Sequence, residues 1–191
     1  VMYGAAEATA RMSYLPTQNL KNKIGSIGVP IPGGKFWLTN HKGERLIKTN
    51  ESGELMYSGK NVALGYAKNF KDLSKGDENK GILKTGDIAF RDKDNFYYIT
   101  GRKDRYVKIF GNRVNLAELE KNISKLGVVS ICKFINGFIK IFIKSTKEEE
   151  ILKANIKNLS NLHLSIFKIK LVNELPLNKN YKLSYNDKNL K

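Results

Sequence analysis

The sequence predicts an α+β protein in which a β-barrel-like subdomain is followed by a small mixed α/β domain. Before Gly101, short β-prone runs alternate with turn signals, as is typical of a small barrel or sandwich. After Gly101, residues with a helical period alternate with strand-like runs, so helices and strands mix. A chain of 191 residues with 41% hydrophobic content is long enough to bury real cores.

Strands are expected to dominate the first half of the chain. The β-prone runs there are KFWLT, GELMY and NFYYIT, at residues 35–39, 53–57 and 95–100. Turn signals rich in Gly, Asn and Asp separate these runs. The polar stretch at 69–81 has little apolar content, so we expect a surface helix or loop there.

A first helix is expected directly after Asn115. Asn115 and Glu118 have capping-box spacing, and the helix should stop near Gly127. The apolar residues that fall on one face of this helix are Leu116, Leu119, Ile123 and Leu126.

A hairpin, a second helix and a last strand are expected in the remainder of the chain. Asn136-Gly137 lies between two apolar runs and is a strong signal for a two-residue hairpin turn. A helix is expected at about 147–159, and the run SIFKIKLV at 165–172 predicts a strand. This domain is therefore expected to be a small sheet with two helices.

The composition is strongly basic, with 34 Lys and Arg against 18 Asp and Glu, for a formal net charge of +16. The positive electrostatic field of such a chain favours phosphate-bearing partners, namely nucleotides, coenzyme A or nucleic acid. Lysines scattered along the sequence are equally typical of an ordinary solvated surface. The single cysteine, Cys132, forbids an internal disulfide and has apolar neighbours typical of a buried structural thiol. Because no apolar run could span a bilayer, we expect a cytoplasmic protein with no membrane span.

Three motifs contain candidate binding residues. In YGAAEAT at 3–9, the tyrosine could stack on a base and Glu7 could hold a divalent metal beside phosphates. In TGD at 85–87, the Asp87 carboxylate can accept hydrogen bonds from both hydroxyls of a ribose. The third motif, GRKDRYVKIFGNRVNLAELE at 101–120, is too long to be a chance match. The three motifs together indicate a nucleotide site.

In this order the motifs resemble the adenylate-forming ligase superfamily, which includes acyl-coenzyme A synthetases, adenylation domains of peptide synthetases, and luciferases. Other matching segments are GSIGVPIPG, GELMYSGKNVALGYAKN, LKTGDIAFRDKDNFYYITGRKD and LPLNKNYK, at 25–33, 53–69, 83–104 and 175–182. The resemblance implies that residues 1–20 end a large amino-terminal domain. It further implies that 21–102 form a β-rich subdomain and that 103–191 form a mobile carboxy-terminal lid.

The resemblance also implies a reaction in two steps. A carboxylate attacks the α-phosphate of ATP to give an acyl-adenylate and pyrophosphate, and the thiol of coenzyme A or of a phosphopantetheine carrier then takes the acyl group. In the first step Lys182 would stabilise negative charge at the α-phosphate. Asp87 would hold the ribose hydroxyls and Arg102 would contact the ribose or phosphate, whereas Tyr3, with Gly4 beside it, would lie against the adenine.

The remaining roles concern the metal and the second step. By resemblance, Glu7 would bind Mg²⁺. Asp104 would be the hinge about which the lid rotates between the two steps. In the second pose the loop at 106–113 would face the active site, where Lys108 would assist thioester formation and Gly111 would leave room for a pantetheine arm.

Several positions depart from the family pattern. Ala6 stands where threonine is usual, Tyr181 where glycine precedes the lysine, and Ser184 where an acidic residue is usual. The Gly-, Ser- and Thr-rich phosphate loop of the family does not occur in these 191 residues. We therefore expect that the chain needs its own amino-terminal domain as a partner and that it lacks ligase activity by itself.

Two other functions remain open at this stage. The charge and the aromatic residues Phe96, Tyr97 and Tyr98 would suit a basic nucleic-acid-binding module, although the ordered motifs argue against a nucleic-acid partner. The substitutions Ala6, Tyr181 and Ser184 would suit a catalytically inactive relative that acts as a scaffold. The sequence leaves open which carboxylic acid is activated and whether the acceptor is coenzyme A or a carrier protein.

Overall fold

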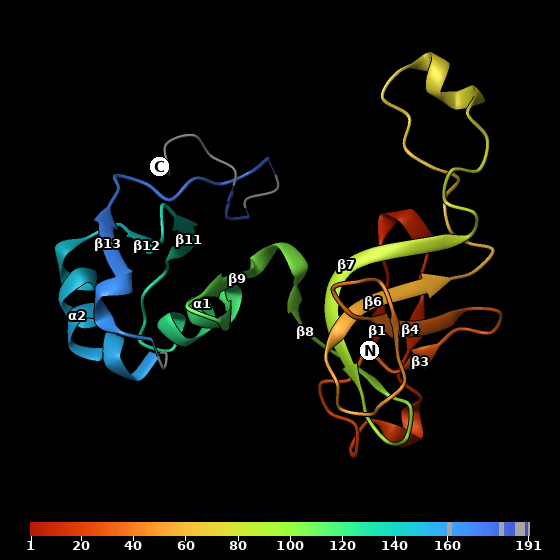
Figure 1. Ribbon diagram of the computed structural model, residues 1–191, viewed down its shortest axis with the longest axis horizontal. Helices are drawn as coiled ribbons and strands as arrows, with labels where there is room; N and C mark the ends of the chain where they lie inside the picture. Colours follow the sequence, from red (N-terminus) through yellow and green to blue (C-terminus); the bar gives the residue numbers. More distant parts are fainter. Residues whose placement is uncertain (160–161, 180–181, 186–189, 191) are drawn as a thin grey trace. The chain divides into compact units, whose positions relative to one another are not determined.

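The computed structural model describes residues 1–159, 162–179, 182–185 and 190. The chain divides into two compact units, Val1–Lys103 and Asp104–Lys191, whose elements are labelled in Figure 1. The regular elements of the first unit are strands and short 3₁₀ turns, whereas the second unit mixes strands with two α-helices, which confirms the α+β class. Among the described residues, no helix has the length and apolar content needed to cross a membrane.

Two antiparallel sheets form the first unit. The small sheet, in the order β1-β2-β3, consists of β1 (Met2–Tyr3), β2 (Ser13–Tyr14) and β3 (Val29–Pro30). The larger sheet, in the order β5-β4-β6-β7-β8, consists of β4 (Lys35–Thr39), β5 (Arg45–Leu46), β6 (Gly53–Ser58), β7 (Ile82–Arg91) and β8 (Tyr97–Arg102). Short 3₁₀ turns connect them: η1 (Ala6–Ala8), η2 (Thr17–Asn19) and η3 (Phe70–Ser74).

The five-stranded sheet is open, so the β-barrel-like subdomain expected from the sequence is not a closed barrel. Strands β5 and β8 remain at its two edges, and the described residues contain no closed barrel. Closure requires two long edges that can pair with each other, whereas β5 pairs with β4 through only two residues. The hydrophobic core lies against this open sheet, where the Phe36 ring packs edge-on against Tyr57 and Tyr97 at centroid distances of 5.4 and 5.2 Å.

The strands and the polar segment predicted from sequence are confirmed in this unit. The runs at 35–39 and 53–57 form β4 and most of β6, and the run at 95–100 supplies the first part of β8. The stretch at 69–81 is an exposed excursion that contains η3, capped by the Asn69 side chain. In Figure 1 this excursion, drawn in yellow, extends away from the sheet of its own unit.

The second unit contains a hairpin, a three-stranded sheet and two helices. Its strands are β9 (Tyr106–Ile109), β10 (Asn112–Asn115), β11 (Ile131–Ile135), β12 (Phe138–Ile143) and β13 (Phe167–Leu171). Its helices are α1 (Leu116–Ser124) and α2 (Thr146–Leu159), with 3₁₀ turns η4 (Lys103–Arg105, which spans the unit boundary) and η5 (Leu164–Ile166). Strands β11 and β12 are antiparallel, whereas α2 carries the chain from β12 to a parallel β13.

Both predicted helices and the predicted hairpin are confirmed. The Asn115 side chain accepts hydrogen bonds from the N–H groups of Ala117 and Glu118, which caps α1. Asn136 and Gly137 both take positive φ, 51° and 82°, as the tight turn between β11 and β12 requires.

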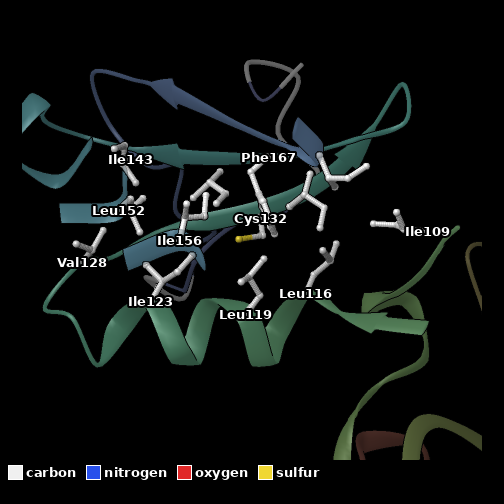
Figure 2. Close-up of a cluster of buried hydrophobic side chains, with 13 residues drawn as sticks. Ile109, Leu116, Leu119, Ile123, Val128, Cys132, Ile143, Leu152, Ile156 and Phe167 are labelled. Atoms are coloured by element: carbon white, nitrogen blue, oxygen red, sulfur yellow. The ribbon is translucent and has the colours of Figure 1, made fainter. Parts of the chain in front are cut away.

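One face of the β11-β12-β13 sheet is covered by the two helices. Figure 2 shows the apolar face of α1 directed at the sheet, with the Cys132 sulfur inside the cluster. Cys132 is fully buried, as its sequence neighbours predicted. The opposite face is covered by apolar side chains near the carboxyl end of the chain, because Leu175 and Leu190 pack with Ile131 and Phe142. The sheet is thus the centre of the unit.

Candidate functional site

An ion pair between two neighbouring strands forms the centre of the candidate site. Asp87 on β7 lies opposite Arg102 on β8, and the Arg102 Nη1 is 3.0 Å from the Asp87 Oδ1. The Thr85 hydroxyl donates to the Leu55 carbonyl oxygen at 2.8 Å and accepts from the Asp87 N–H at 3.1 Å. These bonds fix both the backbone and the side chain of Asp87, which is only 9% exposed.

The TGD motif lies inside strand β7. Gly86 takes φ +71°, a conformation that favours glycine, and the pairing of β7 with β8 shifts register between Ile88 and Ala89. A Cβ on Gly86 would also come within 3.3 Å of the Arg102 Nη2. Glycine is therefore needed here for backbone conformation and for the approach of Arg102.

Tyr3 is bonded to the same carboxylate. Its hydroxyl donates to the Asp87 Oδ2, although the two residues are 84 positions apart in the sequence, and its ring lies edge-on to Phe36 at 6.3 Å. Burial, and then the hydrogen bond to Asp87, raise the pKa of Tyr3, so the phenol stays protonated as a donor. The expected stacking of this ring on adenine stays a prediction.

Glu7, the candidate magnesium ligand, lies in the 3₁₀ turn η1. Its Oε1 accepts a hydrogen bond from the Tyr66 hydroxyl, which lowers the pKa of Glu7 and keeps the carboxylate ionised. The described residues contain no cluster of three or more His, Cys, Asp or Glu side chains that could hold a metal ion. A single ionised carboxylate still fits Mg²⁺, because this ion commonly takes one or two protein carboxylates, with waters and substrate phosphates as its other ligands.

A cavity of about 470 Å³ brings these residues together within the first unit. Its lining includes the backbone of Gly4, which the sequence also assigned to nucleotide binding. The other lining residues are Ala5, Ala6, Glu7, Glu54, Tyr66, Leu83, Lys84, Thr85, Gly86, Asp87 and Arg102. Its volume is in the range of small-molecule sites, and it has carboxylates and an arginine on its wall.

Lys108 and Gly111, the candidates for the second step, lie on a hairpin of the second unit. The segment expected to be a loop at 106–113 is a pair of strands, β9 and β10, joined by the tight turn Phe110-Gly111. The sequence did not reveal this turn, because a phenylalanine at φ +46° is unusual. Lys108 is exposed, and a Cβ on Gly111 would meet no atom within 4 Å, so the turn conformation, φ +82°, accounts for this glycine.

Lys182, the candidate for the first step, is bonded to Asn178 through both of its backbone polar groups. Leu177 pairs with Leu183, and the Asn178 N–H donates to the Lys182 carbonyl oxygen at 2.7 Å. The Asn178 side chain accepts from the Lys182 N–H at 3.1 Å, whereas the lysine side chain is exposed. Tyr181 lies outside the described residues, and the Ser184 N–H donates to the Pro176 carbonyl oxygen at 2.8 Å.

Asp104, the candidate hinge, lies in η4 at the point where the second unit begins. A residue at the boundary between two compact units is well placed to absorb a rotation between them. The position agrees with the proposed role, which stays a prediction.

Two groups in the cavity were missed by the sequence. Tyr66 belongs to the matched segment at 53–69, but nothing in that segment indicates that its hydroxyl reaches Glu7. Glu54 lines the cavity and forms an ion pair with Lys103 at 2.7 Å. Both contacts join residues more than forty positions apart, so local spacing gives no signal for them.

Comparison with known proteins agrees with the motifs. The family described as AMP-binding enzyme matches residues 1–67. The chain is 34% identical over 118 residues to the probable 4-coumarate–CoA ligase 1 of Dictyostelium discoideum, covering 62% of this chain and 21% of that protein. It is 28% identical over 192 residues to the 2-succinylbenzoate–CoA ligase of Geobacillus sp. (strain WCH70), covering 95% of this chain and 38% of that protein.

Solved structures show the same fold. The o-succinylbenzoate CoA synthetase of Bacillus subtilis, in complex with its acyl-adenylate intermediate, aligns with a TM-score of 0.71 at 23% identity. The alignment covers 95% of this chain and 39% of that one. An anthranilate CoA ligase in complex with anthranoyl-AMP aligns with a TM-score of 0.65 at 22% identity, over 95% of this chain and 37% of that one.

The fold and these matches place the chain among segments of AMP-binding enzymes. The chain belongs to the adenylate-forming ligase family. It spans between about a fifth and two fifths of the length of the relatives given above.

Proposed function

We propose that this chain is the carboxy-terminal portion of an ATP-dependent ligase that forms an acyl-adenylate and then a thioester. The observation that supports this most strongly is the cavity of the first unit, where Glu7, Asp87 and Arg102 meet from distant parts of the sequence. A carboxylate for the ribose, a cationic group for phosphate and a carboxylate for Mg²⁺ are what ATP binding requires. The relatives named as CoA ligases support the same reaction class.

In the first step we assign nucleotide binding to the first unit. Asp87 has one oxygen bonded to Tyr3 and the other to Arg102, and each carboxylate oxygen has a second lone pair for a ribose hydroxyl. The substrate carboxylate oxygen forms a bond to the α-phosphorus while the bond from that phosphorus to the pyrophosphate oxygen breaks. The Lys182 ammonium stabilises the charge that gathers at the α-phosphate.

In the second step we assign the acceptor side of the site to the β9-β10 hairpin. Rotation at Asp104 would bring Lys108 and Gly111 to the acyl-adenylate. The acceptor thiol loses its proton, its sulfur bonds to the acyl carbon, and AMP leaves with the oxygen that joined it to the acyl group. Lys182 thus acts while the acyl-adenylate forms, and Lys108 acts while the acyl-adenylate is consumed.

The substrates follow from the reaction class. The first is ATP with Mg²⁺, since related structures are complexes with AMP and with ATP and magnesium. The second is a carboxylic acid, and the acceptor is coenzyme A or a carrier-protein thiol, since the relatives include CoA ligases and a nonribosomal peptide synthetase. An amino-terminal domain of the same enzyme would supply the phosphate loop. The buried free thiol of Cys132 supports a reducing compartment such as the cytoplasm.

A nucleic-acid-binding module is not favoured by the structure. Two of the three aromatic residues considered for base stacking are in the interior, since Phe96 and Tyr97 are 8% and 6% exposed. The third, Tyr98, is already stacked on Phe90 with ring centroids 4.9 Å apart. Only the positive net charge then supports nucleic-acid binding.

The experiment that tests this proposal is an ATP–pyrophosphate exchange assay on the whole ligase with a panel of fatty, aromatic and amino acids. Exchange that depends on one class of acid supports the proposal and names the substrate. AMP binding without exchange for any acid would instead indicate the inactive scaffold, for which Ala6 and Ser184 gave a reason. Binding of single-stranded oligonucleotides at near-physiological salt, without AMP binding, would overturn the proposal in favour of the nucleic-acid module.

A further inference from the structure

A buried ion pair ties the residue after the candidate hinge to the body of the second unit. The Arg105 Nη2 is 2.5 Å from the Glu120 Oε1 on α1, and each side chain is 11% exposed. Arg105 Nη1 also donates to the Cys132 carbonyl oxygen at 3.2 Å, and the Cys132 N–H donates to the same Glu120 oxygen at 2.6 Å. Three elements, namely η4, α1 and β11, therefore converge on two charged side chains.

Such a pair is weak evidence of a purely stabilising role. Burying two charges costs about as much as their attraction returns, and hydrophobic replacements are often at least as stable. The Arg105 Nε is moreover buried without a hydrogen-bond partner among the described residues. A buried pair defines geometry better than it adds stability, so the segments that Arg105 and Glu120 hold in place indicate its role.

The segment that carries Lys182 is held by the same pair. The Tyr185 ring lies under the Arg105 guanidinium, 4.0 Å from ring centroid to Cζ, and its hydroxyl donates to the Glu120 Oε2 at 3.1 Å. Burial, and then the charge of Glu120, raise the pKa of Tyr185, so this hydroxyl remains a donor. Leu183, between Tyr185 and Lys182, packs against the sheet.

We propose that Arg105, Glu120 and Tyr185 are positioning residues for Lys182. They connect the lysine-bearing segment, through α1 and β11, to the residue that follows Asp104. A rotation at Asp104 would then move Lys182 together with the body of the unit, and not as a free loop. This inference rests on the proposed function, because it takes Lys182 as the residue that acts on the α-phosphate.

The test is Tyr185→Phe in the whole ligase, which removes one hydroxyl and keeps the ring over Arg105. We expect acid-dependent ATP–pyrophosphate exchange to fall roughly tenfold in kcat, because small displacements of a catalytic group are costly. The KM for ATP and the rate of thioester formation from preformed acyl-adenylate should change less than about twofold, since neither uses Lys182. Tyr98→Phe is the matched control, because the Tyr98 hydroxyl also donates to a carboxylate, Asp92, and lies in the first unit.

A double-mutant cycle separates this inference from the proposed function. In a Lys182→Ala background, Tyr185→Phe should have no further effect on exchange, because the group that it positions is gone. Equal losses in both half-reactions, or an additive loss in the cycle, would show a merely structural role and overturn the inference. If Lys182→Ala abolishes exchange but Tyr185→Phe does not lower it, only the inference fails. Undiminished exchange in Lys182→Ala overturns both the inference about Tyr185 and the proposed role of Lys182.

Discussion

The cavity of the first unit and the lysine-bearing segments of the second unit differ in how firmly they hold their candidate functional groups. In the cavity, the Asp87 carboxylate is bonded on both oxygens before any ligand arrives. In the turns, Lys108 and Lys182 extend from a hairpin and a loop with exposed side chains. The cavity is therefore preorganised. The two lysines instead carry exposed charges, and what these charges contact depends on where their segments are placed.

This difference fits a division of labour between binding and chemistry. Nucleotide binding gains from rigidity, because groups already in position lose little entropy when the ligand arrives. Under the proposed function, Lys182 and Lys108 serve successive steps and would have to enter and leave one site, which a preformed pocket on the same rigid body would prevent. Lysine suits this use, because a flexible stem carries a compact charge.

The comparison predicts its largest effect at Lys182. Lys182→Ala should lower the kcat of ATP–pyrophosphate exchange by about 10²–10³-fold, because it removes transition-state charge stabilisation. Thioester formation from preformed acyl-adenylate should be nearly unchanged. Lys179→Ala is the matched control, since Lys179 is an exposed lysine in the same loop, and it should keep full exchange. A similar loss in both variants would mean that general positive charge, and not a placed ammonium, supports the reaction.

Lys108→Ala should show the reverse pattern. We expect thioester formation from preformed acyl-adenylate to slow by about ten- to a hundredfold, the size typical of losing a group that assists proton transfer. Exchange should remain within about twofold of the unmodified ligase. Lys121→Ala, an exposed lysine on α1, serves as the control for net charge. Loss of exchange in Lys108→Ala would contradict the assignment of the two lysines to separate steps.

Asp87→Asn tests the preorganised region. The amide keeps the shape but removes the charge that faces Arg102, and it replaces one acceptor by a donor. The KM for ATP should rise about tenfold, with a smaller change in kcat, because binding is affected more than chemistry. Asp94→Asn, in a half-exposed surface pair with Lys23, should leave the KM unchanged. An unchanged KM in Asp87→Asn would show that the ribose is held elsewhere.

The smallest effect concerns Tyr3 and alkaline stability. Because the folded-state pKa of Tyr3 is raised, the folded chain holds this proton more tightly than the unfolded chain does. The resulting stability is fully present below the unfolded pKa of about 10 and is lost as the pH rises above it. Thermal unfolding of the 191-residue chain between pH 8 and 11 should thus be less steeply pH-dependent in Tyr3→Phe. Tyr14→Phe, an exposed tyrosine on the adjacent strand, should keep the slope of the unmodified chain.

Local signals account for the part of the fold that the sequence predicted. Helix α1 begins at its Asn115 cap and the β11-β12 hairpin turns at Asn136-Gly137, because capping and turn conformation depend on a few neighbouring residues. Local signals could not predict that the larger sheet is open, because this depends on the number of residues through which β5 pairs with β4. The Phe110-Gly111 turn was missed because its first residue is not a typical turn residue.

The candidate site shows the same limit. The motifs identified Glu7, Asp87 and Arg102, because resemblance assigns residue types to roles. No motif could give Tyr66 as the partner of Glu7 or Tyr185 as the partner of Glu120, since these contacts arise only when distant segments fold together. The roles implied for Lys108, Asp104 and Lys182 depend on motion between the units and stay predictions.

The bond between Tyr3 and Asp87 also bears on how the protein is made. Its two ends are separated by 84 positions, so a growing chain emerging from the ribosome has Tyr3 long before its partner. Contacts with such large sequence separation close a long loop and form late. Until β7 has been synthesised, the Tyr3 hydroxyl lacks Asp87, and the core around Tyr3 lacks Leu83 and Ala89 and exposes apolar surface. In this unit the cavity lined by Asp87 and Arg102 is therefore among the last features to form, and its completion coincides with the completion of the sheet.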